Sequence, residues 1–293
     1  MKKRSKIVLW ILGVIISILL LTIGGIYAYG NHLFNKIEKI EIDKSDVGIK
    51  DEVEEKLSAY SDSVINIALF GIDAEEGGVG RSDSIIIATI DTTHKKLKLI
   101  SIMRDSYVAI EGHGNDKLNH AYAFGGPQLA IKTLNENFDL NIDDFVAVNF
   151  TTLPKIIDML GGVTIDITSE EVSHIPGISS AGTYNLNGAQ ALSYSRIRYA
   201  TGGDYVRTER QRTILTKIFE KILTINPMKY SSLLNEVLPM VQTSLDNSKI
   251  LELGTEVLKM GVTTLEQERF PLDGYCQGEM INGVYYLTFN KAL

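Results

Sequence analysis

The sequence is poor in cysteine and in net positive charge, and both shortages restrict what the protein can be. Its only cysteine is Cys276, which excludes an intrachain disulfide and a cysteine-based zinc site. The formal net charge is −7, from 29 basic and 36 acidic side chains. Nucleic-acid-binding proteins carry basic surfaces, so no nucleic-acid partner is expected. The chain also lacks internal repeats and low-complexity tracts, which leaves room for one large domain or two small ones.

One long uncharged run lies near the N-terminus. Residues 7–29 carry no charged side chain and follow a short segment with four basic residues. The run is long enough to span ~30 Å of hydrocarbon, and basic residues favour the cytoplasmic side. We therefore predict a cytoplasmic tail at 1–6, a transmembrane signal-anchor at 7–29 and an extracellular remainder. A cleaved signal peptide is the alternative, but Ala28-Tyr29-Gly30 is a poor cleavage site.

The remainder divides into a polar segment and a domain in which strands and helices alternate. Residues 30–63 are predicted to form a stalk, and residues 64–293 the extracellular catalytic domain. Apolar runs typical of buried strands occupy 64–70, 85–90, 97–102, 145–150 and 163–167. Helical patterns separate the later runs. This alternation predicts an α/β fold, an α-β-α sandwich with a central mixed sheet.

The segment 195–212 is rich in arginine for so acidic a protein. It holds five arginines: Arg196, Arg198, Arg207, Arg210 and Arg212. Residues two apart share one face of a strand, so the first two are predicted to point the same way from an extended arm. Gly202-Gly203 predicts a turn, and Asp204 predicts the N-cap of a helix whose apolar residues continue to Leu223.

Arginines on both arms of such a turn indicate an anion-binding site. Arg207 and Gln211 are four residues apart and so lie on one face of the predicted helix. A helix N-terminus attracts anions, and the planar guanidinium matches phosphate oxygens. The arrangement indicates a site for a multiply charged phosphate such as pyrophosphate. The alternative is a solvated face in which the arginines pair with Asp204 and Glu209.

Further charged residues lie where predicted strands end. They are Asp73, Arg81, Asp83, Arg104 and Asp105. Ligand sites of α/β sheets collect at strand ends, and carboxylates beside bound phosphate suit Mg²⁺. Asp73 and Asp83 could instead cap turns and pair with arginines. Lys117 is a candidate phosphate contact. His120 is a candidate base or ligand, although a lone helical histidine is more often simply hydrogen-bonded.

These motifs together resemble the LytR-CpsA-Psr family of Gram-positive envelope proteins. The resemblance covers about 64–223 and lies in five blocks: Gly71-Ile72-Asp73 with Arg81-Ser82-Asp83-Ser84, Arg104-Asp105-Ser106, Lys117-Leu118-Asn119-His120-Ala121-Tyr122, the segment 186–198, and Asp204-x-x-Arg207-x-x-Arg210-Gln211. The chain departs from the family pattern at Met103, where proline is usual, and at Ala74-Glu75.

The resemblance implies a phosphotransferase outside the cell. Such proteins transfer an anionic glycopolymer, of the teichoic acid or capsule type, from a polyprenyl-pyrophosphate carrier to the C6 hydroxyl of N-acetylmuramic acid in peptidoglycan. It implies that the isoprenoid lies in an apolar tunnel and that Asp73 and Asp83 bind Mg²⁺. The pyrophosphate would be held by Arg81, Arg104, Arg196, Arg198 and Arg207, with Gln211 nearby. Lys117 and Arg210 are the other residues predicted to contact it.

No nucleophilic cysteine or serine motif is evident, so we expect direct attack by the acceptor hydroxyl. Transfer between phosphate esters needs alignment and charge neutralisation more than covalent chemistry. Asp83 or Asp105 could be the general base. One alternative is a membrane-anchored regulator that binds polyprenyl phosphates without turnover. Another is a hydrolase that releases the polymer to water.

Overall fold

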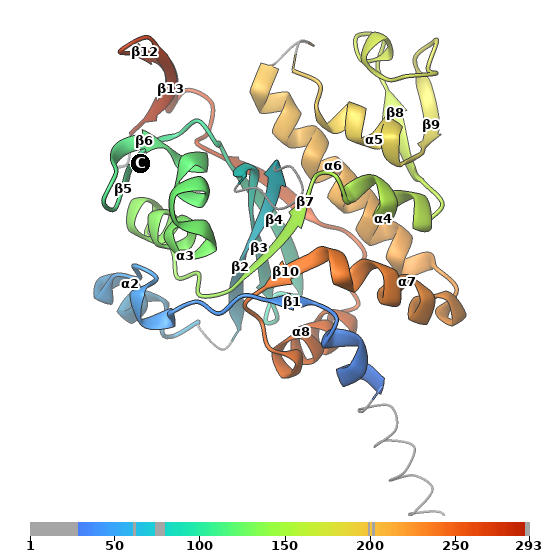
Figure 1. Ribbon diagram of the computed structural model, residues 1–293, viewed down its shortest axis with the longest axis horizontal. Helices are drawn as coiled ribbons and strands as arrows, with labels where there is room; N and C mark the ends of the chain where they lie inside the picture. Colours follow the sequence, from blue (N-terminus) through green and yellow to red (C-terminus); the bar gives the residue numbers. More distant parts are fainter. Residues whose placement is uncertain (1–28, 61–62, 74–79, 199, 201–202, 291–293) are drawn as a thin grey trace, which may run out of the picture.

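The computed structural model describes residues 29–60, 63–73, 80–198, 200 and 203–290 (Figure 1). The predicted cytoplasmic tail, all but the last residue of the predicted anchor, and Ala74-Glu75 lie outside these residues. Within the described part of the chain, no helix combines the length and apolar character needed to cross a membrane.

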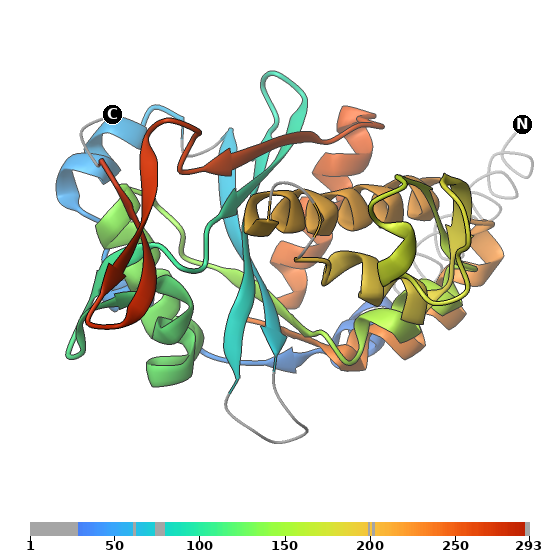
Figure 2. The same cartoon turned by 90° about the horizontal axis from the view of Figure 1, so that it is seen from above.

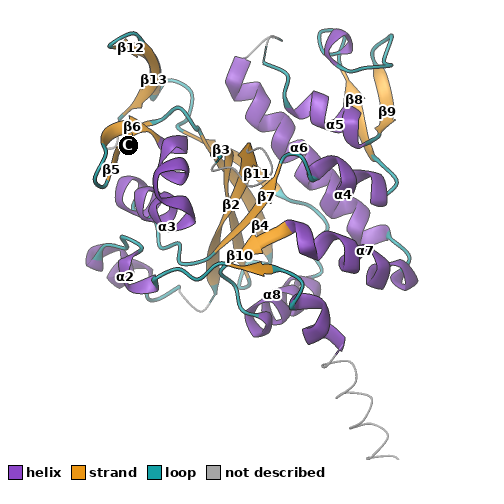
Figure 3. Ribbon diagram, viewed as in Figure 1, coloured by secondary structure: helices purple, strands orange, loops and turns teal. Residues whose placement is uncertain are grey.

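A seven-stranded sheet runs through the middle of the molecule (Figures 1 and 3). From edge to edge it contains β1 (Glu38–Lys39), β10 (Val241–Thr243), β7 (Phe145–Asn149), β2 (Val64–Asp73), β3 (Arg81–Asp91), β4 (Lys96–Ile102) and β11 (Glu266–Phe270). The β2 strand is parallel to β7 and antiparallel to β3, so the sheet is mixed, as predicted. Four of the five predicted strands belong to it.

Helices cover both faces of the sheet, which confirms the predicted α-β-α sandwich. Because side chains alternate across a strand, Phe70 and Ile85 face the core under α3 (Leu118–Phe138), while Ile67 and Ile90 face the core with α8 (Asn247–Met260). The long helix α6 (Gly203–Thr224) packs on the same side as α8 through Phe219. Figure 1 shows α3 on one side of the sheet and α6 and α8 on the other.

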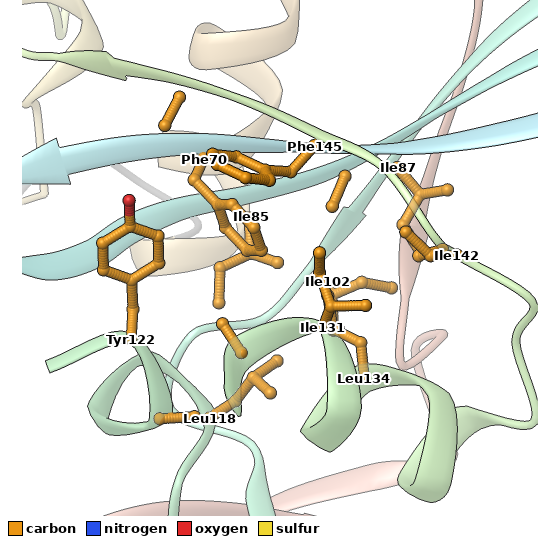
Figure 4. Close-up of a cluster of buried hydrophobic side chains, with 14 of the residues drawn as sticks. Phe70, Ile85, Ile87, Ile102, Leu118, Tyr122, Ile131, Leu134, Ile142 and Phe145 are labelled. Atoms are coloured by element: carbon orange, nitrogen blue, oxygen red, sulfur yellow. The ribbon is translucent and has the colours of Figure 1, made fainter. Parts of the chain in front are cut away.

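The larger core lies between the sheet and α3 (Figure 4). Ile131 and Leu134 of α3 are fully buried there against Phe145 of β7. The α3 helix is kinked at Gly125 and Gly126, just before Pro127, because the backbones of these two glycines are not helical.

A second, smaller core lies beside the sheet. It is built by α4 (Leu153–Met159), β8 (Val163–Ile167), β9 (Gly182–Leu186) and α5 (Gly188–Ser195), which pack against α6. The β8 strand pairs only with β9, outside the main sheet. The β9 strand was not among the strands predicted from sequence, because its Thr-Tyr-Asn-Leu run is too short and polar to be distinguished from a loop by pattern alone.

Two hairpins flank the N-terminal end of α3. They are formed by β5 (Tyr107–Ile110) with β6 (Gly114–Lys117), and by β12 (Cys276–Ile281) with β13 (Val284–Phe289). The hairpins touch through the rings of Tyr107 and Tyr286, whose centres are 4.8 Å apart. The β12–β13 hairpin, in red, lies at the upper left in Figure 1 and at the left in Figure 2, whereas the first described residues, in dark blue, lie at the lower right in Figure 1. The remaining helices of more than one turn are α2 (Asp51–Leu57) and α7 (Tyr230–Val237).

Residues 30–63 do not stand apart from the domain as the predicted stalk. Leu33 and Ile37 are buried against Leu238, β1 extends the main sheet, and Val47 belongs to the larger core. These apolar side chains are scattered among charged ones in the sequence. Burial removes them from water and so holds the segment against the domain.

Candidate functional site

The site is built around an irregularity where β2 and β3 pair. Gly71 is opposite Ser84 and Ile72 is opposite Ser82, so Asp83 is the additional residue of a β-bulge. A bulge redirects a side chain out of the regular alternation. Gly71 is required here because a Cβ would lie 2.9 Å from that of Ser84 and 3.0 Å from the ring of Phe150. The bulge places a buried carboxylate at the end of the sheet.

Asp83 is bound on both carboxylate oxygens. Arg104 Nη1 lies 2.9 Å from Oδ2, and Asn119 Nδ2 donates to Oδ1 at 3.0 Å. Burial alone would raise the pKa of Asp83, but the charge of Arg104, the Asn119 hydrogen bond, and the charges of Arg207 and Arg81 outweigh it. The pKa of Asp83 is therefore held below its usual range, and the group is a carboxylate at neutral pH.

Arg104 joins three acidic residues from separate segments. Besides Asp83 it approaches Asp105 at 3.5 Å and Asp204 of α6 at 3.6 Å. Its Nε is buried and makes no hydrogen bond among the described residues, because Asp105 is too distant. Within the described chain this nitrogen is therefore held only by a loose ion pair with the Asp105 carboxylate.

Arg207 lies deeper, in the first turns of α6. Its Nε is 3.1 Å from Asp204, and its Nη2 donates to the Asp83 carbonyl oxygen at 3.5 Å. Burial lowers the pKa of Arg207 to about 10, and repulsion by Arg104 and Arg198 opposes the attraction of Asp204 and Asp83. Arg207 remains charged at neutral pH, with neighbouring cations that favour a bound anion.

Three exposed arginines complete the cluster. The charge of Arg81 helps to lower the pKa of Asp83, and the charge of Arg198 helps to lower the pKa of Arg207. Both exposed arginines therefore lie near these two buried side chains. Neither makes an ion pair within 4 Å to another described residue. Arg196 lies 3.5 Å from Asp73 and 5.9 Å from the Phe150 ring centre. We define Arg81, Arg104, Arg196, Arg198 and Arg207 as the arginine cluster.

The predicted strand for Arg196 and Arg198 is wrong. Asn187 and Gln190 form a capping box that starts α5, which runs to Ser195 with Arg196 as its C-cap. Ile197 is buried in the smaller core, between two exposed arginines. Both side chains nevertheless reach the cluster, from a helix end and the loop that follows.

Arg210 does not join the arginine cluster. Its Nε donates to Glu171 at 2.6 Å, and both side chains are buried, so its predicted phosphate contact is replaced by an internal ion pair. Arg212 likewise faces inward, where its Nη1 donates to Ser101 at 2.6 Å. Gln211 is on the predicted side of α6 and lines a cavity beside the cluster.

That cavity is an apolar space of about 190 Å³ between the sheet and α6. Its walls come from β2, β3, β7, α4 and α6, and include Leu69, Ile86, Val148, Phe150, Ile214 and Leu215. Two further lining residues adjoin charged ones: Ser84 follows Asp83, and Ser195 precedes Arg196. The cavity can hold an apolar chain whose charged end reaches the arginines.

Lys117 and His120 lie beyond Asp105, on the side away from Asp83. Lys117 Nζ is 2.8 Å from Asp105, at the edge of the cluster. His120 Nδ1 is 2.8 Å from Asp116, which is the hydrogen-bonded role that we considered the commoner one for this histidine.

The residues predicted to bind Mg²⁺ lie on adjacent strands. In the strand register, Asp73 of β2 lies opposite Arg81 of β3, and Arg81 is two residues before Asp83. No cluster of three or more His, Cys, Asp or Glu side chains within the described ranges could hold a metal ion. Mg²⁺ requires fewer protein ligands because waters and substrate phosphates complete its shell. Oδ1 of Asn119, buried beside Asp83 without a hydrogen-bond partner in the described chain, offers another oxygen. The donor set fits Mg²⁺ bound together with a phosphate.

Two members of the site were missed as site residues in the sequence. Asp204 was interpreted as a helix cap, but it links Arg104 to Arg207. Asn119 orients Asp83. The signal for Asp204 was its position three residues before an arginine at a helix start, which puts both on one face. Asn119 carried no comparable signal, because its partner is 36 residues away.

Comparisons with known proteins agree on one family. The LytR_cpsA_psr family model matches residues 30–293. The chain is 33% identical over 297 residues to the polyisoprenyl-teichoic acid–peptidoglycan teichoic acid transferase TagU of Oceanobacillus iheyensis, covering 97% of this chain and 90% of that protein. It is 34% identical over 197 residues to the regulatory protein MsrR of Staphylococcus aureus, covering 66% of this chain and 60% of MsrR.

A solved structure agrees in fold. The family protein YwtF (TagT) with bound octaprenyl pyrophosphate lipid superimposes with a TM-score of 0.61 at 29% sequence identity. The match covers 78% of this chain and 85% of that one.

Proposed function

The chain belongs to the LytR-CpsA-Psr family, and on that premise we propose that it is a phosphotransferase. Its donor would be an anionic glycopolymer of the teichoic acid type on a polyprenyl pyrophosphate. Its acceptor would be the C6 hydroxyl of N-acetylmuramic acid in peptidoglycan. This proposal is supported by the relative named as a teichoic acid transferase and by the similar fold with a bound prenyl pyrophosphate.

The observation that carries the proposal is the contact between the arginine cluster and an apolar cavity. A prenyl pyrophosphate has an apolar tail joined directly to a diphosphate. The cavity between the sheet and α6 offers space for part of such a tail, and Arg196 follows the cavity residue Ser195. Arg81 and Arg198, which are exposed and make no ion pair with another described residue, supply donors for the diphosphate.

The proposed reaction exchanges one phosphate ester for another. The acceptor oxygen attacks the phosphorus that carries the glycopolymer, the bond from that phosphorus to the bridging oxygen breaks, and polyprenyl phosphate leaves. Arginines around the diphosphate stabilise the charge that moves onto the leaving phosphate. Asp83 is a poor base because its pKa is depressed, so Asp105, the other carboxylate beside Arg104 that we considered as a base, is our candidate to take the hydroxyl proton.

We propose that Mg²⁺ assists this reaction. Asp73 and Asp83, with the amide oxygen of Asn119, would hold the ion against the diphosphate. When bound, the ion would neutralise charge on the phosphate oxygens. We also propose that residues 7–29 anchor the protein, with a cytoplasmic N-terminus and the domain on the outer face of the cell membrane.

The proposal is tested with a lipid-linked donor and peptidoglycan acceptor. Wild type should form the phosphodiester-linked product and release polyprenyl phosphate, while Arg104→Ala should abolish product and remain folded by circular dichroism. The matched control is Arg269→Ala, which removes an arginine of similar burial that pairs with Asp273 outside the cluster. Product from Arg104→Ala at the wild-type rate would contradict the proposal.

A regulator without turnover is the second candidate, favoured by the similarity to MsrR. The same assay separates it, because a regulator would bind the lipid-linked donor and release no polyprenyl phosphate. Free polymer as the product would instead indicate a hydrolase.

A further inference from the structure

A line of exposed and half-buried rings leads away from the arginine cluster on the side of Asp105. It begins at Tyr285 and Tyr286 on β13 and ends at Phe124 on α3. Asp116, Lys117 and His120 lie between these rings. We call these six residues the aromatic belt. Tyr285 and Phe124 are 47% and 44% exposed.

Contacts make the belt continuous. Lys117 Nζ lies 6.0 Å from the ring centre of Tyr285 and 5.8 Å from that of Tyr286. The Tyr286 hydroxyl donates to Asp116 at 3.2 Å, and Asp116 accepts from His120 at 2.8 Å. The rings of His120 and Phe124 are 5.9 Å apart. The belt therefore combines aromatic rings with charged and hydrogen-bonding groups between them, and one face of Phe124 is stacked on His113.

The belt is joined to the candidate site at Asp105. Lys117 bonds to the Asp105 carboxylate at 2.8 Å, and the backbone N–H of Leu287, next to Tyr286, donates to the Asp105 carbonyl oxygen at 2.8 Å. Ser106 pairs with Leu287 in a parallel bridge. Burial raises the pKa of Tyr285, and the negative charges of Asp105 and Asp204 raise it further. The Tyr285 ring therefore lies near both carboxylates.

We propose that the aromatic belt binds the sugar rings of the acceptor glycan and places its hydroxyl beside Asp105. This rests on the proposed function and locates its second substrate. A pyranose has an apolar C–H face that packs on an aromatic ring and an edge of hydroxyls that needs donors and acceptors, which the belt supplies. The cavity proposed for the donor's tail is lined by residues of β2, β3, β7, α4 and α6, none of which belongs to the belt, so the two substrates would use separate surfaces.

A membrane surface is the competing occupant for exposed rings beside a lysine. In Figure 1 the β12–β13 hairpin, which carries Tyr285 and Tyr286, lies at the upper left, whereas the first described residues, in dark blue, where the predicted anchor would join the domain, lie at the lower right. Asp116 in the middle of the belt is also unsuited to an anionic bilayer. Both observations favour the glycan.

The ring of Tyr285 has a defined support. A Cβ at Gly278, on the neighbouring strand β12, would lie 2.6 Å from the Tyr285 ring. The ring therefore lies against bare backbone, and Gly278→Ala should displace it without changing any atom of the belt.

The experiment measures binding of a soluble peptidoglycan glycan fragment in the absence of donor. Tyr285→Ala should weaken this binding by about tenfold, since it removes most of one apolar ring contact. Tyr285→Phe should bind like wild type, and Gly278→Ala should weaken binding in part. Tyr60→Ala is the matched control, because Tyr60 is a 58% exposed tyrosine distant from the belt in sequence and structure.

Kinetics supply the second readout. In transfer assays Tyr285→Ala should raise KM for the glycan about tenfold, with kcat and the Kd of the prenyl pyrophosphate unchanged. Unchanged glycan Kd and KM would overturn the proposal, as would loss of kcat alone. Weaker binding to anionic vesicles with intact glycan binding would also overturn it, in favour of the membrane. If wild type binds the glycan through Tyr285 but shows no transfer activity, the proposed function is refuted while the proposed glycan-binding role of the belt is retained.

Discussion

Arg198 and Arg210 are twelve residues apart in one arginine-rich stretch, yet the structure gives them opposite roles. Arg198 is exposed and makes no ion pair among the described residues, so Arg198→Ala should change the free energy of unfolding by less than about 0.5 kcal/mol. It should remove a charge-assisted contact to the diphosphate worth roughly 1.5–3 kcal/mol. The Kd for a prenyl pyrophosphate should therefore rise roughly 10- to 150-fold.

Arg210→Ala should do the reverse. The Arg210 and Glu171 side chains are 5% and 6% exposed and 2.6 Å apart, so the substitution leaves a buried carboxylate without its partner. Breaking such a pair costs roughly 3–5 kcal/mol, which corresponds to a fall in Tm of roughly 6–20 °C in a domain of this size. Prenyl pyrophosphate binding by the molecules that stay folded should be close to wild type.

The assay is a thermal melt of each variant, followed by titration with a short-chain prenyl pyrophosphate well below the lower Tm. Arg210→Ala with Glu171→Gln should recover part of the lost stability, because the second change removes the unpaired charge. The reasoning is refuted if Arg210→Ala melts like wild type and loses ligand affinity, or if Arg198→Ala unfolds early and binds normally.

Three further predictions follow from the geometry around Asp83 and the cavity. The folded-state pKa of Asp83 is depressed, so the stability that Asp83 contributes is present above its unfolded pKa of about 3.9 and is lost as pH falls through the folded value. In urea unfolding from pH 2 to 7, the free energy of unfolding of Asp83→Asn should therefore fall less steeply toward acid pH than that of wild type. Asp73 is exposed, so Asp73→Asn should keep the wild-type Tm and raise the Mg²⁺ concentration needed for half-maximal transfer; an unchanged requirement would exclude Asp73 as a ligand. Val148→Phe should fill part of the cavity and weaken binding of long-chain prenyl pyrophosphates, while inorganic pyrophosphate binds as before; equal loss of both would contradict the division into tail and diphosphate.

The features predicted correctly from sequence are those with strong local patterns. The runs that form β2, β3 and β4 are long, apolar and bounded by turns, and the helix after Asp204 has apolar residues at regular spacing. Arg104, Arg207 and Asp83 were recognised because charged residues at strand ends and helix starts of an α/β fold converge on one edge. For these residues, local position and residue type were sufficient.

The errors arise where a distant partner decides the outcome. Arg210 is sequestered by Glu171, 39 residues earlier, and nothing near Arg210 reveals that pairing. The two-residue strand β1 is fixed by pairing with β10, some 200 residues later. The alternation of Arg196 and Arg198 is a different case, because α5 ends at Ser195 with Arg196 as its C-cap, so two residues two apart did not indicate a strand here.

The charges of the site explain how it can exist without ligand and still select a diphosphate. The five arginines of the cluster and Lys117 face four carboxylates, those of Asp73, Asp83, Asp105 and Asp204. Asp83, Asp105 and Asp204 lie against the buried cations Arg104 and Arg207, which could not otherwise be desolvated, whereas Asp73 pairs with the exposed Arg196. The surplus positive charge therefore resides on exposed side chains, Arg81 and Arg198, which water solvates until an anion replaces it. A diphosphate diester carries two negative charges, equal to that surplus, whereas a neutral glycan gains nothing from the cluster and must be recognised elsewhere, on rings and hydroxyl-binding groups such as those beyond Asp105.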